Sequence, residues 1–142
     1  MSSDQLLLAA VDKYFRALHA CDTDLLDEVF HPAASLFDVD GGEVCVDPLA
    51  SWRQDVATRP SPASAGQARE EEVVSVLWLS PDCATVHVRL RVLDEVFVDH
   101  LSFVRDRDSF RIVAKTWHLE RTLATTVSYA EAPTIGVEVT RA

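Results

Sequence analysis

The chain has 142 residues, of which 48% are hydrophobic and 25% are charged, and its formal net charge is −10. This length predicts one domain that can bury a core without a disulfide or a structural metal. The acidic balance argues against a nucleic-acid or anionic-membrane surface, because phosphate groups are bound by clustered cations.

The cysteines and histidines show no ligand spacing. Cys21, Cys45 and Cys83 are an odd number at wide spacing, without a CxxC motif. They are typical of reduced residues in a cytoplasmic protein, and we expect no metal and no cofactor. The first residues lack the cationic segment of a signal peptide, and no apolar run is long enough to span a membrane.

The first half of the chain has the periodicity of helices interrupted by a hairpin. Apolar residues at helical spacing predict a helix over residues 3–20 and a short second helix that Pro32 ends. Residues 34–38 and 43–46 are predicted to pair as a hairpin, and a third helix starts at Asp47-Pro48.

From residue 72 the apolar period changes to two, which predicts four antiparallel strands over residues 72–79, 84–93, 96–104 and 110–118. This order predicts an α+β fold, a cone-shaped curved antiparallel or mixed sheet wrapped on three N-terminal helices. We expect a single domain over 1–142, with a core of about 5–119, a tail over 120–142 and a pocket inside the cone.

Three polar residues are predicted to point into this apolar interior. Asp99 shares a strand face with Phe97 and Leu101, and a carboxyl group there must find a partner or stay protonated with a raised pKa. Asp38 shares a face with Leu36, and Tyr14 lies on the apolar stripe of the first helix. A single buried residue of either type more often has a structural role than a catalytic one. A phenol and two carboxyl groups around one cavity, however, can act together as one general base and two general acids.

Other residues are candidates for the pocket wall or for the opposite face of the sheet. Trp52, Phe97 and Trp117 are either core residues or aromatic walls of the pocket. His118 is a further pocket candidate, because simple alternation places it on the face of Ile112. The outer sheet face is either solvated or, as we favour, a homodimer surface; it carries His87, Arg89, Arg91 and His100.

Several stretches resemble one superfamily, the nuclear transport factor 2-like proteins, over nearly all of residues 5–119. They are Tyr14-Phe15-x-Ala17-Leu18-His19-Ala20-x-Asp22, Phe30-His31-Pro32-x-Ala34, Asp99-His100-Leu101-Ser102 and Arg111-Ile112-Val113-Ala114-Lys115. The likeness to its "putative lumazine-binding" branch depends on His31-Pro32, Trp52, Arg59-Pro60-Ser61-Pro62 and Lys115-Thr116-Trp117-His118.

The segment from Val11 to Asp38 is also similar to the start of bacterial ketosteroid isomerases. That resemblance implies Asp38 as the base and Tyr14 and Asp99 as hydrogen-bond donors to an enolate oxygen. The middle of the chain, residues 52–66, departs from the isomerase pattern. Fold similarity by itself assigns no activity.

Three hypotheses follow for the function. The first is a cofactor-independent isomerase, dehydratase or cyclase that moves a proton next to a carbonyl through Asp38, Tyr14 and Asp99. The second is a non-catalytic binder of a small hydrophobic, aromatic or pterin-like ligand, with Trp52, Phe97, Trp117 and His118 around it. The third is a scaffold domain that dimerises through its outer sheet face.

Overall fold

The computed structural model describes residues 1–123 and 139–140. The elements in chain order are α1 (Ser3–Ala20), α2 (Thr23–Val29), β1 (Phe30–Asp40), β2 (Glu43–Pro48), α3 (Leu49–Thr58), β3 (Glu71–Ser80), β4 (Cys83–Val92), β5 (Glu95–Asp106), β6 (Ser109–Thr122) and β7 (Val139–Thr140).

Local signals in the sequence set the first two helices. α1 begins at a capping box, in which Ser2 and Gln5 each accept a hydrogen bond from the other's backbone N–H. It ends at Cys21, which adopts the left-handed conformation with φ 50°. The carboxylate of Asp22 then accepts from the N–H groups of Asp24 and Leu25, so α2 starts directly after the turn.

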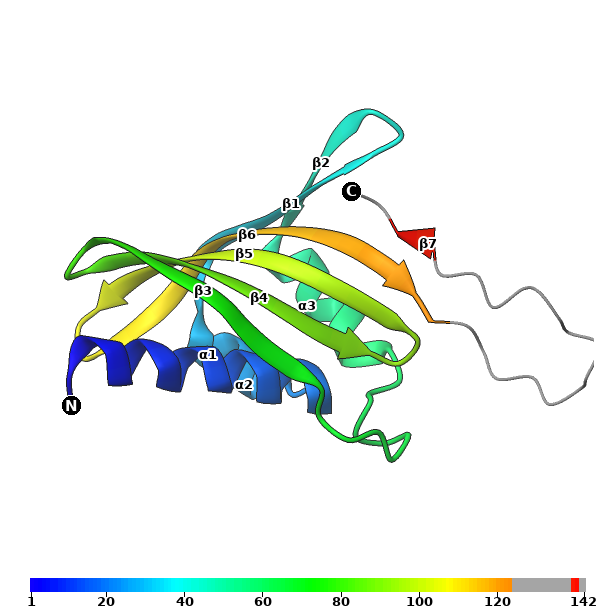
Figure 1. Ribbon diagram of the computed structural model, residues 1–142, viewed down its shortest axis with the longest axis horizontal. Coiled ribbons are helices and arrows are strands. Elements are labelled where there is room, and N and C mark those ends of the chain that lie inside the picture. The colour runs from blue at the N-terminus through cyan, green and yellow to red at the C-terminus, as the bar shows by residue number, and fades with distance from the viewer. Residues whose placement is uncertain (124–138, 141–142) are drawn as a thin grey trace, which may run out of the picture.

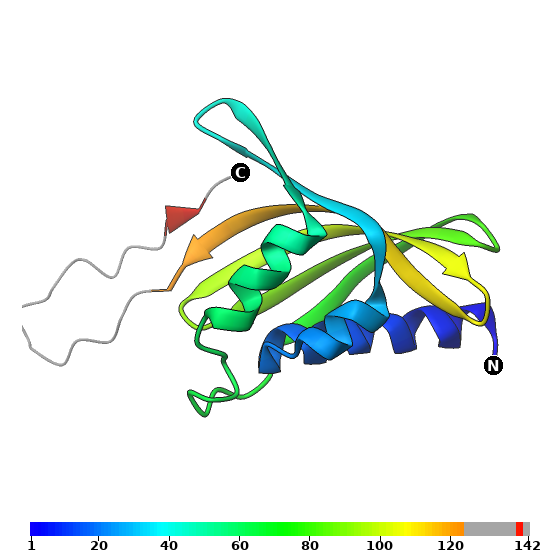
Figure 2. The ribbon, with the colours of Figure 1, turned by 180° about the vertical axis from the view of Figure 1, so that it is seen from behind.

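The strands form one mixed sheet in the order β2-β1-β6-β5-β4-β3, with β7 paired to β6. β1 runs parallel to β6, and the other pairings are antiparallel. The sheet curves over α1 and α2, while α3 lies on the same side and the β1–β2 hairpin extends beyond it (Figures 1 and 2). This is the α+β, cone-like architecture that the element order predicts.

The core lies between the concave face of the sheet and the apolar stripe of α1. The alternation predicted for β4 and β5 is largely confirmed: most side chains predicted to point inward are buried, and Val92 and Phe97 are partly buried against the core. The buried ones include Val86, Val88, Leu90, Leu101 and Phe103, which belong to one core cluster with Leu7, Val11, Tyr14 and Leu18 of α1.

A β-bulge in β6 changes which side chains of that strand point inward. Ser102 of β5 pairs with Ala114, whereas the next residue, Phe103, pairs with Ile112, so Val113 is an extra residue on β6. Ile112 is buried before the bulge and Lys115 after it. The placement of His118 on the face of Ile112 was therefore wrong, because one inserted residue exchanges the two faces.

The ends of several helices and strands differ slightly from the predicted ends. β1 begins at Phe30 and runs through His31 and Pro32, so His31 lies in a strand and not at a helix end. Pro48 is the N-cap of α3 and not its first helical residue. β6 extends to Thr122, so the first residues of the predicted tail continue the sheet. The rest of that tail, apart from β7, lies outside the described residues.

Candidate functional site

Tyr14 and Asp99 meet in the interior, although α1 and β5 carry them far apart in the sequence. The hydroxyl of Tyr14 donates a hydrogen bond of 2.6 Å to Asp99 Oδ2. Tyr14 is 0% and Asp99 1% exposed, so both predicted inward orientations are confirmed. Burial, together with the charge of Asp99, raises the pKa of Tyr14 well above its usual value. Tyr14 therefore remains a hydrogen-bond donor across the physiological range.

Lys115 is the cation of this buried cluster. Its Nζ lies 3.9 Å from Asp99 Oδ2 and 4.3 Å from the centroid of the Trp52 ring. Burial lowers the pKa of Lys115, and the positive charge of Arg59 lowers it further, whereas the charge of Asp99 opposes this change. Contact with the face of an indole ring partly replaces the lost water.

These groups line a cavity of about 230 Å³ inside the cone. The sheet, the end of α1, and α3 with its C-cap supply the walls. The lining residues are Leu18, Asp47, Trp52, Asp55, Arg59, Leu90, Val92, Phe97, Asp99, Lys115 and Trp117. Phe97 and Trp117 meet edge to face with their ring centroids 5.8 Å apart. A cavity smaller than the usual range for drug-sized ligands suits a molecule of one or two fused rings.

Two residues that line the cavity carry buried polar atoms without hydrogen-bond partners among the described residues. Within residues 1–123 and 139–140, neither Asp99 Oδ1 nor Arg59 Nε has a partner, although both atoms are buried. The contacts of Lys115 Nζ in the same part of the chain are the long ion pair to Asp99 and the two aromatic rings. Buried polar atoms are normally satisfied, so this cavity presents one acceptor and two donors to a ligand.

The charges around the cavity restrict the ligand further. Asp47 and Asp55 line it together with Asp99, whereas the cations are Arg59 and Lys115. The whole chain carries a net charge of −10. A polyanionic ligand would meet this negative field, so the arrangement favours a neutral, partly polar molecule.

Asp38 lines a different depression. It lies with Trp117 and His118 just beyond Phe37 and Thr116, the last residues at which β1 pairs with β6. Partial burial, and then the charges of Asp47 and Asp40, raise the pKa of Asp38. The structure thus joins Tyr14 to Asp99 but does not bring Asp38 to them. Asp38 and His118 line a separate depression, and Trp117 lines both this depression and the interior cavity.

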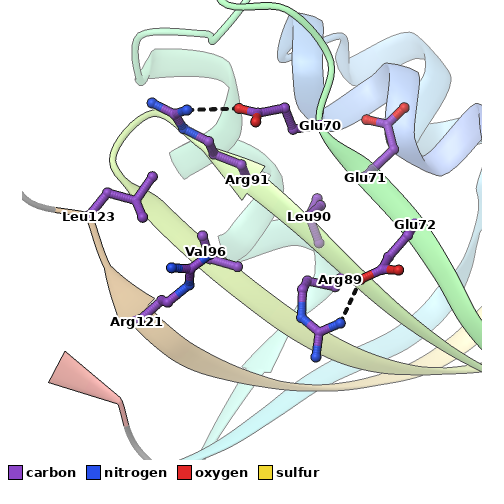
Figure 3. Close-up of a pocket in the computed structure, with 9 residues that line it drawn as sticks. All are labelled: Glu70, Glu71, Glu72, Arg89, Leu90, Arg91, Val96, Arg121 and Leu123. Atoms are coloured by element: carbon purple, nitrogen blue, oxygen red, sulfur yellow. Dashed lines mark hydrogen bonds and ion pairs between the residues drawn. The ribbon is translucent and has the colours of Figure 1, made fainter. Parts of the chain in front are cut away.

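The outer face of the sheet carries arginines that pair with glutamates. Arg89 contacts Glu72 and Glu120 at 2.6 and 2.9 Å, and Arg91 contacts Glu70 at 2.8 Å. Figure 3 shows the β4 arginines turned toward the acids of the β3 edge around a depression of about 240 Å³. On this face the rings of His87 and His100 meet with their centroids 4.8 Å apart. Surface pairs of this kind contribute little stability.

Sequence reasoning missed Lys115 and Arg59 as members of the site. The bulge at Val113 hid Lys115, because simple alternation from Ile112 points Lys115 outward. Arg59 follows α3 directly as its C-cap, and in the sequence it stood out only as part of a motif that carries the family resemblance. Within the described residues, no cluster of three or more His, Cys, Asp or Glu could hold a metal, and no helix is long and apolar enough to cross a membrane.

Solved structures similar to this one share its fold. A nuclear transport factor 2-like protein of unknown function from Silicibacter pomeroyi is 23% identical with a TM-score of 0.73, over 84% of this chain and 99% of that one. A nuclear transport factor 2-like protein of unknown function from Shewanella baltica is 14% identical with a TM-score of 0.71, over 80% of this chain and 90% of that one. A ketosteroid isomerase-like protein from Erwinia carotovora atroseptica is 13% identical with a TM-score of 0.56, over 80% of this chain and 92% of that one.

A family model assigns the chain more narrowly. The model described as "Putative lumazine-binding" matches residues 2–118, which is most of the chain. A search of curated proteins gives no match. The chain belongs to this family, within the nuclear transport factor 2-like superfamily.

Proposed function

We propose that the chain binds a small, flat, neutral heterocycle that carries a cyclic amide edge. The observation that supports this most directly concerns two adjacent polar groups of cavity-lining residues: within the described part of the chain, Asp99 Oδ1 has no donor and Lys115 Nζ has no short acceptor contact. An –NH–C(=O)– edge would donate its N–H to Asp99 and offer its carbonyl oxygen to Lys115.

The aromatic walls fit the flat part of such a ligand. Trp52, Phe97 and Trp117 line the same cavity as Asp99 and Lys115. Ring stacking and apolar burial would supply the affinity, while the two polar contacts would fix the orientation. Lumazines, pterins and uracils all combine a flat ring with this edge, in agreement with the family description.

Tryptophan fluorescence tests this proposal with a panel of cyclic-amide heterocycles and their ring-N-methylated counterparts. We expect saturable quenching by lumazine or a related compound. Methylating the ring nitrogen should weaken binding about tenfold or more, equivalent to about 1.4 kcal/mol, because Asp99 Oδ1 stays unpaired. Equal affinity for both members of every pair, or no quenching by any compound, would contradict the proposal.

The three tryptophans give matched controls for this titration. Trp78 lies outside the cavity, where its indole N–H bonds Asp4 Oδ1 at 3.0 Å. The Trp78→Phe variant should therefore retain the quenching. Trp52→Phe and Trp117→Phe should each reduce it, because these residues line the cavity.

Proton transfer next to a carbonyl is a second candidate function, favoured by the raised pKa of Asp38 and by the Tyr14–Asp99 pair. In this case a substrate would extend past Trp117, with its oxygen toward Asp99 and its acidic carbon toward Asp38. The test is isomerisation of a small β,γ-unsaturated ketone. Equal rates for the wild type and Asp38→Asn would remove Asp38 as the base.

We extend the proposal to a homodimer formed through the outer sheet face. On this face Leu77 of β3 is 73% exposed, and Leu77 lies opposite Thr85 of β4. A Leu77→Glu change should shift a dimer to monomer in light scattering. Val44→Glu on the β1–β2 hairpin is the matched control, because Val44 is similarly exposed at 71% but lies on the strand at the opposite edge of the sheet. A wild-type monomer at all concentrations would contradict the dimer.

A further inference from the structure

The chain contains two lysines, and the fold places them in opposite surroundings. Lys13 is on α1 with its side chain 31% exposed, and its Nζ lies 3.4 Å from Glu28. Lys115 is on β6 with its side chain 8% exposed, and it lines the interior cavity. One lysine is thus an ordinary surface ammonium, while the other lies where a small molecule can reach it.

The burial of Lys115 favours a neutral amine more than the surroundings of a surface lysine do, whereas its contact with two aromatic rings favours the ammonium. The ring centroids of Trp52 and Tyr14 are 4.3 and 5.3 Å from Nζ. Among the described residues, the carboxylate that forms an ion pair with Nζ is Asp99, at 3.9 Å, which is beyond hydrogen-bond distance. Burial lowers the pKa of Lys115, as does the charge of Arg59, and the charge of Asp99 does not reverse this.

Asp99 is placed to accept and return a proton. Its Oδ2 is held by the Tyr14 hydroxyl and lies next to Nζ, whereas its Oδ1 has no partner among the described residues. A carboxylate fixed beside an amine can take a proton from the ammonium and later deliver it to a leaving hydroxyl group. The high pKa of Tyr14 keeps its hydroxyl protonated during these steps.

We propose that Lys115 is a reactive amine that forms an imine with small aldehydes that enter the cavity. Asp99 takes one proton from the Lys115 ammonium, and the free electron pair of Nζ then forms a bond to the carbonyl carbon. The carbonyl oxygen becomes the hydroxyl of a carbinolamine, taking up a proton as Nζ loses one. Asp99 returns its proton to this hydroxyl, which leaves as water, and the C=N bond forms with no net oxidation or reduction.

The cavity selects the aldehyde by size and shape. Its volume of about 230 Å³ and its lining by Trp52, Phe97 and Trp117 suit a single aromatic ring that bears one aldehyde group. This activity does not require recognition of a cyclic amide, so it goes beyond the function proposed above and can stand or fail separately.

Reductive trapping in the wild-type chain compares the two lysines directly. The chain is incubated with benzaldehyde and cyanoborohydride near neutral pH, and the modified residues are quantified by peptide mass mapping. We expect Lys115 to be labelled about tenfold or more faster than Lys13, because only the unprotonated amine reacts. In the urea-unfolded chain the two lysines should be labelled at similar rates.

A folded chain in which Lys13 is labelled as fast as Lys115 or faster would overturn the proposal, as would a Lys115 that stays unlabelled. Lys115→Arg keeps the positive charge and should abolish the fast labelling, whereas Lys13→Arg should preserve it. The comparison within the wild type decides the question even if Lys115→Arg does not fold. Fast labelling of Lys115 without fluorescence quenching by any heterocycle would reject only the cyclic-amide proposal. Quenching without fast labelling of Lys115 would reject only the imine proposal.

Discussion

The hydroxyl of Tyr14 and the carboxylate of Asp99 are joined by a 2.6 Å hydrogen bond that ties the first helix to the centre of the sheet. Both residues are completely or almost completely buried. This bond satisfies one oxygen of a carboxyl group that has little access to water, and it also fixes where the other oxygen points. The same contact therefore serves the stability of the core and the geometry of the cavity.

The first prediction concerns this hydrogen bond. Tyr14→Phe keeps the ring but leaves Asp99 without its short donor, so it should lower the free energy of unfolding by about 1–3 kcal/mol. Urea denaturation at pH 7 measures this loss. Phe15→Leu, a conservative change of the neighbouring buried aromatic residue, controls for general sensitivity of α1 to repacking. An unchanged midpoint in Tyr14→Phe would show that the bond contributes nothing.

The second prediction is energetic coupling between Lys115 and Asp99. Lys115→Met and Asp99→Asn should each destabilise the fold, because each leaves a buried polar partner alone. The double variant should be more stable than the sum of the single losses predicts, by about 1 kcal/mol or more. Denaturation of all four proteins completes the cycle. Strict additivity would mean that the 3.9 Å approach carries no interaction energy.

The third prediction is a rise in stability with alkaline pH that depends on Lys115. Between its lowered pKa and the usual value of 10.5, the unfolded chain binds one proton more than the folded chain does. The free energy of unfolding therefore increases with pH in this window. Above about pH 10 the raised pKa of Tyr14 has the opposite effect, because the folded chain retains a proton that the unfolded chain loses.

Denaturation between pH 7 and 11 measures both effects. Lys115→Met should flatten the rise, and Tyr14→Phe should remove the fall at the upper end. Lys13→Met provides the control, since Lys13 is partly exposed on the surface and should leave the profile unchanged. A profile of Lys115→Met that matches the wild type would contradict the prediction.

The fourth prediction concerns Asp38. Its pKa is raised by partial burial and by the charges of Asp47 and Asp40, so the charged form is disfavoured in the folded state. Asp38→Asn should therefore stabilise the chain slightly at pH 7 and lose this advantage below about pH 4, where the carboxyl is protonated in both states. Thermal unfolding at pH 7 and pH 3.5 makes the comparison. Destabilisation at pH 7 would indicate a structural hydrogen bond instead.

The sequence predicts most of this architecture because the relevant signals are local. The capping residues Ser2 and Asp22 mark helix starts, and period-two alternation marks β4 and β5. Asp99 is identified as an inward carboxyl for the same reason, since an even spacing separates it from Leu101. Tyr14 was found from helical periodicity in the same way.

The contents of the cavity depend on relationships that are not local. Asp38 shares a face with Leu36, but it lies one residue beyond Phe37, where the pairing of β1 with β6 ends. The register between two strands that are distant in the sequence sets that end, so periodicity within β1 does not predict it. The orientation of Lys115 depends on the extra residue Val113, which no turn signal marks. Periodicity alone could therefore find the interior of the cone but not all of the side chains within it.

The bulge at Val113 has a consequence for comparing relatives of this chain. Removing that one residue would leave Lys115 and Trp117 on the concave side, because Ala114 already pairs with Ser102 and Lys115 with Leu101. An ungapped alignment across β6 would then equate an interior amine in one homologue with a surface residue in another. A single-codon deletion can thus change the sequence spacing across β6 without changing which side chains form this wall, and homologues should be grouped by strand register before their residue identities are compared.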